Sequence, residues 1–201
     1  MRKILVLDTS YTLEMITERK LDKPVLSRDL GGYFEHVWSV HPYATIIPPK
    51  DVSNTLGGLT KTNFSGRHTI IEGKIGRFSL LRFFPLLNFI LSQIELLIEL
   101  GKLIKKEKID VIRSGDPYYI SLIGLLLSRI YKIPLVIRVN ADYDKFYQET
   151  GKLALPRLFK KRWIEKKVER FVLKRTDLIG AVNEASRAFA IKNGATKENT
   201  T

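Results

Sequence analysis

Four short polar segments of this sequence carry the residue types from which a functional site could be built. Each follows a run of apolar residues that predicts a β-strand. In an open parallel sheet, ligands bind beyond the carboxyl ends of the strands, so the residues directly after each strand are the candidates for chemistry. The four segments are Asp8-Thr9-Ser10-Tyr11, Arg113-Ser114-Gly115-Asp116-Pro117, Arg138-Val139-Asn140-Ala141-Asp142-Tyr143-Asp144 and Asn183-Glu184-Ala185-Ser186-Arg187.

Each of the last three segments has a plain structural alternative. In the third, which is the densest polar cluster, strand alternation places Arg138, Asn140 and Asp142 on one face, yet a solvated loop with an Asp–Arg pair would look the same. In the second, Asp116 before a proline is typical of a helix start. In the fourth, capping alone explains Asn183, and Arg187 is the more suggestive residue.

Several familiar signatures are absent from the sequence. No G-x-G-x-x-G follows the first strand and there is no Walker loop, which argues against a dinucleotide-dependent or P-loop enzyme. The chain has no cysteine, which excludes disulfides and thiol catalysis and suits the cytosol. His36 and His41 lie on opposite faces of a predicted strand and are interpreted as structural residues, so no metal is expected.

The elements that must position these segments alternate between strand and helix. A strand over 3–8 is followed by a helix capped by Thr9-Ser10, kinked or split at Pro24 and ended by Gly31-Gly32. This alternation predicts an α/β fold, a Rossmann-like parallel sheet with helices on both faces, in a single domain over residues 1–201. The further expected strands are 33–41, 68–71, 109–112, 134–139 and 178–182, with helices 79–106 (broken near Pro85), 116–131, 155–174 and 184–192 and a loop-rich stretch over 48–68.

Charge and composition narrow the classes of protein. With 44% apolar and 27% charged residues the chain is globular, and its most hydrophobic region, residues 83–94, is short of the roughly 20 residues of a spanning helix. A net charge of +13 favours nucleic acid, anionic lipid or nucleotide ligands as partners.

Residues 157–175 concentrate this charge, with nine basic and two acidic side chains. A solvated helix face is the plain interpretation, but aromatic residues beside lysines, here Phe159 and Trp163, favour a membrane surface. The expected core-facing stripe is Ile164, Val168, Phe171 and Val172, and the expected membrane-surface residues are Lys160, Trp163, Lys167, Arg170 and Lys174.

Three stretches together resemble the amino-terminal half of GT-B glycosyltransferases of the family 4, group 1 kind. They are residues 109–118 (IDVIRSGDPY), 132–143 (KIPLVIRVNADY) and 168–186 (VERFVLKRTDLIGAVNEAS). No single piece is diagnostic, but their order and spacing are. The chain departs from the family in having Asn140 where a histidine is frequent, and Thr9-Ser10-Tyr11 where a Gly-Gly loop is frequent.

The resemblance implies a retaining, metal-independent transferase without a cofactor. A nucleotide-sugar donor would be held mainly by a second domain that this chain lacks, and the first domain would receive a glycan or lipid-linked acceptor, so the fragment alone is expected to be inactive. The implied catalytic residues are Asn140 and Asp142, the acceptor-binding residues Ser10, Tyr11, Arg113, Asp116 and Arg138, and the residue on the phosphate side of the donor Arg187.

The alternative from a different class is a noncatalytic basic α/β module that binds RNA or an anionic membrane. It explains the net charge of +13 without an enzyme. The sequence has neither an aromatic stacking motif of the RNP type nor a GxxG clamp, so no nucleic acid is expected as a partner. The expected location is cytoplasmic, peripheral on the inner face of the membrane.

Overall fold

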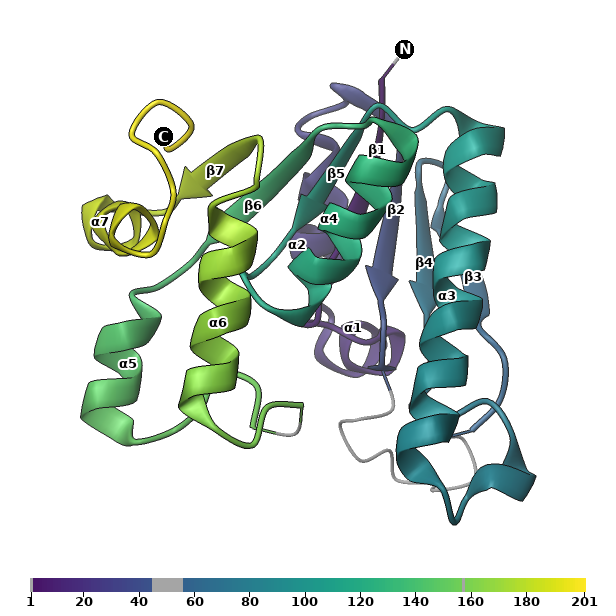
Figure 1. The fold of residues 1–201 in the computed structure, drawn as a ribbon. Coiled ribbons are helices and arrows are strands. Elements are labelled where there is room, and N and C mark those ends of the chain that lie inside the picture. Colours follow the sequence, from purple (N-terminus) through teal and green to yellow (C-terminus); the bar gives the residue numbers. More distant parts are fainter. Residues whose placement is uncertain (1, 45–55, 157) are drawn as a thin grey trace. The chain divides into compact units, whose positions relative to one another are not determined.

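The computed structural model describes residues 2–44, 56–156 and 158–201, which form an α/β fold with mostly parallel strands (Figure 1). The predicted fold class, Rossmann-like α/β, is confirmed. By the packing of its residues the chain divides into two compact units, Met1–Asp110 and Val111–Thr201. The division does not test the prediction of a single domain over residues 1–201, which stays a prediction.

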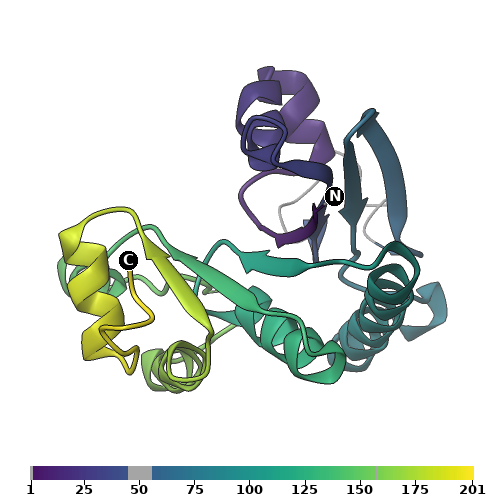
Figure 2. The same ribbon diagram turned by 90° about the horizontal axis from the view of Figure 1, so that it is seen from above.

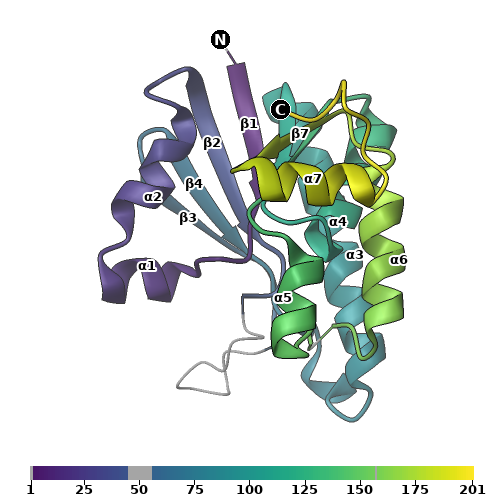
Figure 3. The same cartoon turned by 90° about the vertical axis from the view of Figure 1, so that its left-hand side faces the viewer.

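The first unit contains four strands in the order β3-β4-β2-β1 (Figure 3). Strands β1 (Arg2–Leu7), β2 (Phe34–His41) and β4 (His68–Glu72) are parallel and were predicted, because their apolar residues are buried. Strand β3 (Thr60–Ser65) runs antiparallel to β4 and was not predicted, since this edge strand is polar and has no buried residue. Of the predicted loop-rich stretch, residues 48–55 lie outside the described residues.

The predicted first helix is split, but not by its proline. Helices α1 (Leu13–Arg19) and α2 (Asp22–Leu26) are separated by Lys20, whose φ of 53° ends α1, and Pro24 lies in the first turn of α2, which tolerates proline. A short helix, η1 (Ser27–Asp29), follows. The cap is Thr12, whose hydroxyl accepts the amide of Met15, and the prediction that Thr9-Ser10 caps the helix was wrong.

Helix α3 (Pro85–Glu107) begins at the predicted break and follows the short helix η4 (Ser79–Leu81). Its buried polar side chains tie the preceding segment to the helix. The Oδ1 atom of Asn88 accepts the amides of Arg77 (2.7 Å) and Phe78 (2.9 Å), and its Nδ2 donates to the Phe78 carbonyl (2.8 Å). A Cβ atom on Gly76 would lie 2.7 Å from Asn88 Nδ2, so glycine permits this close approach.

The second unit contains three parallel strands in the order β5-β6-β7, namely β5 (Val111–Ser114), β6 (Leu135–Val139) and β7 (Leu178–Ala181). Its helices are α4 (Tyr119–Tyr131), α5 (Tyr143–Thr150), α6 (Arg162–Leu173) and α7 (Glu184–Lys192), and α4 packs beside α6 (Figure 2). Helix α5 was not predicted, and none of its residues is fully buried. The predicted helix over 155–174 begins only at Arg162.

Candidate functional site

Two of the four predicted polar segments meet at the carboxyl ends of β5 and β6, and a residue of α7, which follows β7, joins them. The side-chain amide of Asn140, after β6, donates to the carbonyl of Gly115, after β5, at 2.9 Å. The ring of Tyr143 lies 5.2 Å from that of Tyr118 and 5.5 Å from that of Phe189 on α7, in edge-on contacts. The parallel strands thus bring residues from three separate stretches of the chain into one cluster.

Asp116 organises the turn after β5 without capping the following helix. Its Oδ1 accepts the amide of Tyr118 at 2.9 Å, and α4 begins at Tyr119, with Tyr118 in the cap position. The prediction that a helix starts at Asp116 was therefore wrong by three residues, because this turn comes first. The hydroxyl of Ser121 donates to the Asp116 carbonyl and contacts the hydroxyl of Ser114, which fixes the turn against β5.

The polar residues after β6 divide between surface and helix cap. Arg138 and Asn140 are exposed, as is expected of residues open to a ligand. Asp142 is half-buried and caps α5, since its Oδ1 accepts the amides of Asp144 and Lys145, each at 3.0 Å. The cap occupies one carboxylate oxygen of Asp142 and orients the side chain at the edge of the site.

The segment after β7 is explained partly by capping. The Oδ1 of Asn183 accepts the amide of Ser186 at 2.9 Å, which confirms it as the cap of α7. The Nε of Arg187 donates to the Thr200 carbonyl at 3.4 Å, and one terminal nitrogen lies 3.8 Å from Glu184. Arg187 is half-buried and held against the carboxyl-terminal residues of the chain.

The first polar segment belongs to the first unit and has partners that the sequence analysis missed. Asp8 accepts the amide of Ser10 at 2.8 Å and pairs with buried Arg28 at 2.5 Å. The Nε2 of His41 lies 3.1 Å from the Thr9 carbonyl, and burial lowers the pKa of His41 to about 4, so the imidazole is neutral and donates this hydrogen bond. No sequence signal indicated this contact, which results from the pairing of β1 with β2, the strand that His41 ends.

Ser10 and Tyr11, which the sequence analysis assigned to the acceptor, differ in exposure. Ser10 is exposed, whereas Tyr11 is half-buried and packs against a small apolar cluster. The buried members of that cluster are Ile16, Val25 and Ile70.

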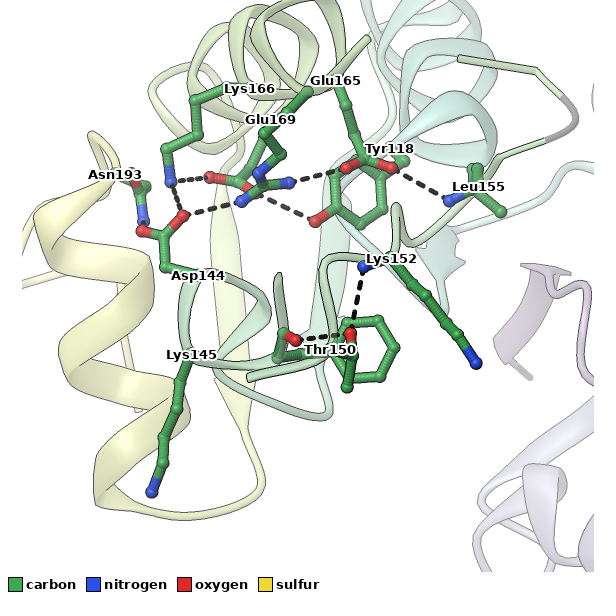
Figure 4. Close-up of polar contacts among 12 residues, drawn as sticks. Tyr118, Asp144, Lys145, Thr150, Lys152, Leu155, Glu165, Lys166, Glu169 and Asn193 are labelled. Carbon is green, nitrogen blue, oxygen red and sulfur yellow. Dashed lines mark hydrogen bonds and ion pairs between the residues drawn. The ribbon is translucent and has the colours of Figure 1, made fainter. Parts of the chain in front are cut away.

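Buried charges connect α6 to the elements around it (Figure 4). Glu165 and Glu169 are fully buried on α6, together with Val172 and Leu173. The predicted core-facing stripe was therefore right only for Val172. Ile164 and Val168 are only half-buried and Phe171 is 46% exposed, because the helix turns its two glutamates inward to meet buried partners.

Two cations and a tyrosine contact these glutamates. Arg162 contacts Glu165 and Asp144 at 2.7 Å each, and Lys166 lies 2.7 Å from Glu169 and 2.5 Å from Asp144. The hydroxyl of Tyr118 donates to Glu169 at 3.0 Å. The backbone amide of Leu155 donates to Glu165, and Asn193 donates to Asp144, so the network joins α5, α6, the end of α7 and the start of α4.

Burial and ion pairing shift the pKa values of the carboxylates in this network in opposite directions. Burial raises these pKa values, whereas the cationic partners lower them. Burial raises the pKa of Glu169 above its usual value, and the charges of Lys166 and Arg162 offset only part of that rise. It also raises the pKa of Tyr118, so the phenol stays protonated and donates to Glu169. For Asp144, burial acts to raise the pKa, but hydrogen bonds from Lys166, Asn193 and Arg162 outweigh it and lower the pKa to about 2.

The sequence profile of glycosyltransferase family 4 matches residues 64–201, more than half of the chain. The chain belongs to this family. The expected resemblance to the amino-terminal domain of a GT-B enzyme is thereby confirmed, and the matched region includes the cluster at the ends of β5, β6 and β7.

Solved structures share the fold at low sequence identity. Anabaena Alr3699/HepE in complex with UDP-glucose matches all of this chain with 43% of its own, at a TM-score of 0.54 and 16% identity. The UDP-GlcNAc 2-epimerase of Methanocaldococcus jannaschii matches all of this chain with 45% of its own, at a TM-score of 0.51 and 15% identity. The family 4 chain thus spans less than half the length of these proteins. No curated protein matches it.

The predicted membrane-surface residues of this family 4 chain lie on its outside. Lys160, Lys167, Arg170 and Lys174 are exposed, and Trp163 is 56% exposed with the Lys167 ammonium 4.9 Å from its ring centre. Phe159 does not share this surface fully, since it is half-buried with its ring 6.4 Å from that of Tyr118. Within residues 2–44, 56–156 and 158–201, no group of three or more acidic or histidine side chains could hold a metal ion.

The low pKa of Asp144 predicts an acid-dependent loss of stability. The folded pKa of about 2 lies below the ordinary value of 3.8, so the stabilisation is present above about pH 4 and is lost as the pH falls towards 2. We expect the free energy of unfolding of the wild type to fall more steeply between pH 5 and pH 2 than that of Asp144→Asn, measured by urea denaturation at about one-unit steps of pH.

The matched control is Glu149→Gln, which removes an exposed carboxylate from the same helix. Its pH profile should follow that of the wild type. The raised pKa of Glu169 has the opposite sign, because its contribution is fully present at low pH and falls as the pH rises, so it cannot produce the acid loss. Parallel profiles for the wild type and Asp144→Asn would show that Asp144 is not held as a buried anion.

Proposed function

We propose that this chain is the acceptor-side half of a glycosyltransferase that transfers a sugar from a nucleotide-sugar donor to a glycan or lipid-linked acceptor. The observation that carries the proposal is the convergence of the residues after β5 and β6, through the contact between Asn140 and Gly115, inside the region matched by the family. The proposal includes a retaining, metal-independent reaction, with the donor held mainly by a second domain. The structure of Anabaena HepE with UDP-glucose supports a uridine nucleotide in that role.

In this proposal Asn140 and Asp142 act nearest to the reacting groups. The exposed amide of Asn140 hydrogen-bonds the transferred sugar, and the carboxylate of Asp142 orients an acceptor hydroxyl. The negative charge of a departing nucleotide diphosphate must be offset by cations and amide dipoles when no metal ion offsets it. Arg187 is assigned to the phosphate side of the donor, with Arg113 and Arg138 able to add positive charge, and the acceptor is bound by Ser10, Tyr11, Arg113, Asp116 and Arg138.

The donor assignment is tested by isothermal titration calorimetry of the 201-residue chain with UDP-glucose, UDP-GlcNAc and GDP-mannose. We expect weak binding or none, because the donor contacts are proposed to lie mainly in a second domain. The matched experiment titrates the full-length enzyme that contains this chain. Tight, sugar-specific binding by the 201-residue chain would place the donor site in this half and overturn the assignment.

We also propose that the basic face of α6, which includes the residues next to both ends of the helix, docks on anionic lipid, peripherally at the inner face of the membrane. Its support is the exposure of Lys160, Lys167, Arg170 and Lys174 beside Trp163. Each cation near such a surface contributes about 1 kcal/mol within a Debye length of about 8 Å, so this docking should be modest and sensitive to salt. It would serve a lipid-linked acceptor, or a noncatalytic membrane module if no transfer is found.

A further inference from the structure

The start of α3 carries an exposed apolar surface that the proposed function does not use. We name it the apolar tip. A single exposed apolar side chain is ordinary, but a contiguous group of them marks an interaction site. The tip consists of Phe78, Leu80, Phe83, Phe84, Leu86 and Leu87, of which Leu80 is 90%, Phe83 74% and Leu86 72% exposed.

The apolar tip is held in place by buried polar side chains beneath it. Asn88 binds the backbone of Arg77 and Phe78 by three hydrogen bonds, and the hydroxyl of Ser92 donates to the Lys74 carbonyl at 2.5 Å. These bonds fasten the segment before η4 to α3. The tip is therefore presented in a fixed conformation, and a partner that covers it has little further chain entropy to remove.

The exposed residues cover more than half of the circumference at the start of the helix instead of forming one narrow stripe. Residues 83–87 are consecutive and all exposed. Successive helical positions are about 100° apart, so Pro85, Leu86 and Leu87 alone cover about 200° of the helix circumference. A folded protein partner covers one side of a helix, whereas a fluid lipid phase can enclose a projecting tip on several sides.

The charges around the apolar tip match an anionic surface. From residue 73 to residue 94 the chain has three basic residues and no acidic one. The guanidinium of Arg82 lies 4.7 Å from the ring centre of Phe83, and that of Arg77 lies 5.4 Å from the ring centre of Phe78 while it pairs with Glu95 at 2.8 Å. Aromatic and aliphatic residues flanked by cations are typical of protein segments that lie in a lipid interface.

We propose that the apolar tip inserts into the interface of an anionic lipid bilayer. The described residues include no helix long and apolar enough to cross a membrane, so this contact is a partial insertion. The inference stands on the tip alone and does not depend on the docking proposed for α6. It differs from that docking in chemistry, because apolar insertion persists at high salt whereas attraction between charges is screened.

The test is flotation of the 201-residue chain with phosphatidylcholine vesicles and with vesicles rich in phosphatidylglycerol, at low and high salt. The wild type should bind the anionic vesicles and keep a measurable part of this binding at high salt. The variant Leu80→Ser/Phe83→Ser should lose at least about a hundredfold in partitioning at high salt, since burying one Leu or Phe side chain is worth about tenfold or more.

Two control variants separate the tip from other surfaces. Ile98→Ser/Ile130→Ser removes two exposed side chains, 53% and 58%, that are not part of the tip, and it should bind as the wild type does. Lys160→Glu/Lys167→Glu/Lys174→Glu reverses the basic face of α6 and should weaken binding at low salt only. Circular dichroism of each variant confirms that it is folded.

A fluorescence measurement reports insertion directly. Phe83→Trp, combined with Trp163→Phe, places a tryptophan in the tip and leaves only buried Trp38 as background. Anionic vesicles should shift its emission to the blue, and brominated lipid should quench it.

Three results would overturn the inference. The first is a wild type that does not float with anionic vesicles, and the second is a Leu80→Ser/Phe83→Ser variant that floats as the wild type does. The third is a tip that is covered by a second copy of the chain, seen as self-association that the same variant abolishes in sedimentation equilibrium without vesicles. Failure of α6 docking alone would leave the tip-dependent binding at high salt in place.

Discussion

Arg162→Met should lower the free energy of unfolding by about 3–5 kcal/mol, the cost of leaving buried charges without their partner. Arg162 is only 15% exposed and contacts Glu165 and Asp144 at 2.7 Å and Glu169 at 3.6 Å. Both glutamates are fully buried, so water cannot replace the guanidinium without opening the packing of α6. Urea denaturation followed by circular dichroism measures the change.

Two further variants distinguish loss of the network from loss of any arginine. Arg170→Met removes an exposed cation from the same helix and should change the free energy of unfolding by less than about 0.5 kcal/mol. Arg162→Met/Glu165→Leu removes a buried charge together with its partner and should recover part of the stability, because apolar replacement of a buried pair is often neutral. An Arg162→Met variant as stable as Arg170→Met would show that the network contributes no net stability.

The pattern of apolar residues correctly predicted those strands and helices whose buried residues are apolar. Strands β1, β2, β6 and β7 have buried aliphatic residues and were predicted within two residues of their observed ends, and α7 was predicted with its observed bounds. The strict alternation of strand and helix in the second unit was sufficient to predict parallel strands, because their connections require a crossover.

The same reasoning failed where polar groups are buried or apolar groups are few. The orientation of α6 was mispredicted because apolar periodicity places Ile164, Val168 and Phe171 inside, whereas Glu165 and Glu169 are buried by partners distant in sequence. The sequence between 118 and 193 contains each partner, but only one feature of it points to buried carboxylates. A run of basic residues that includes two glutamates four positions apart was the one available signal.

The sequence predicted where the polar segments lie in the sheet, whereas the functional roles of their residues stay predictions. Parallel strands guarantee that their carboxyl ends share an edge, so the segments after β5, β6 and β7 could be brought together from sequence alone. Which side chains cap helices depends on where each helix begins, and that boundary is set by tertiary packing. Asp142 thus caps a helix that was not predicted, and Asp116 does not cap the helix that was.

Asn140→Ala and Asp142→Asn should each lower turnover of the full-length enzyme about 10²- to 10³-fold, equivalent to about 2.7–4 kcal/mol of lost transition-state stabilisation. Asn140 is exposed, so its loss removes the contact with Gly115 but no core packing. Asparagine caps helices about as well as aspartate, so Asp142→Asn retains the α5 cap and removes only the charge. The melting temperatures of both variants should stay close to that of the wild type.

The matched control for these variants is Asn183→Ser, at the same edge of the second unit. Serine keeps the cap of α7, and we propose no role for Asn183 in sugar transfer. This variant should therefore keep wild-type turnover. Asp142→Ala removes cap and charge together, and it should add a loss of stability of about 0.5–2 kcal/mol to the loss of turnover. A fall in turnover of Asn140→Ala and Asp142→Asn without a fall in melting temperature locates both side chains at the reacting groups, because a structural role would move the two quantities together. Full activity in both variants would reduce the segment after β6 to a solvated loop and a helix cap.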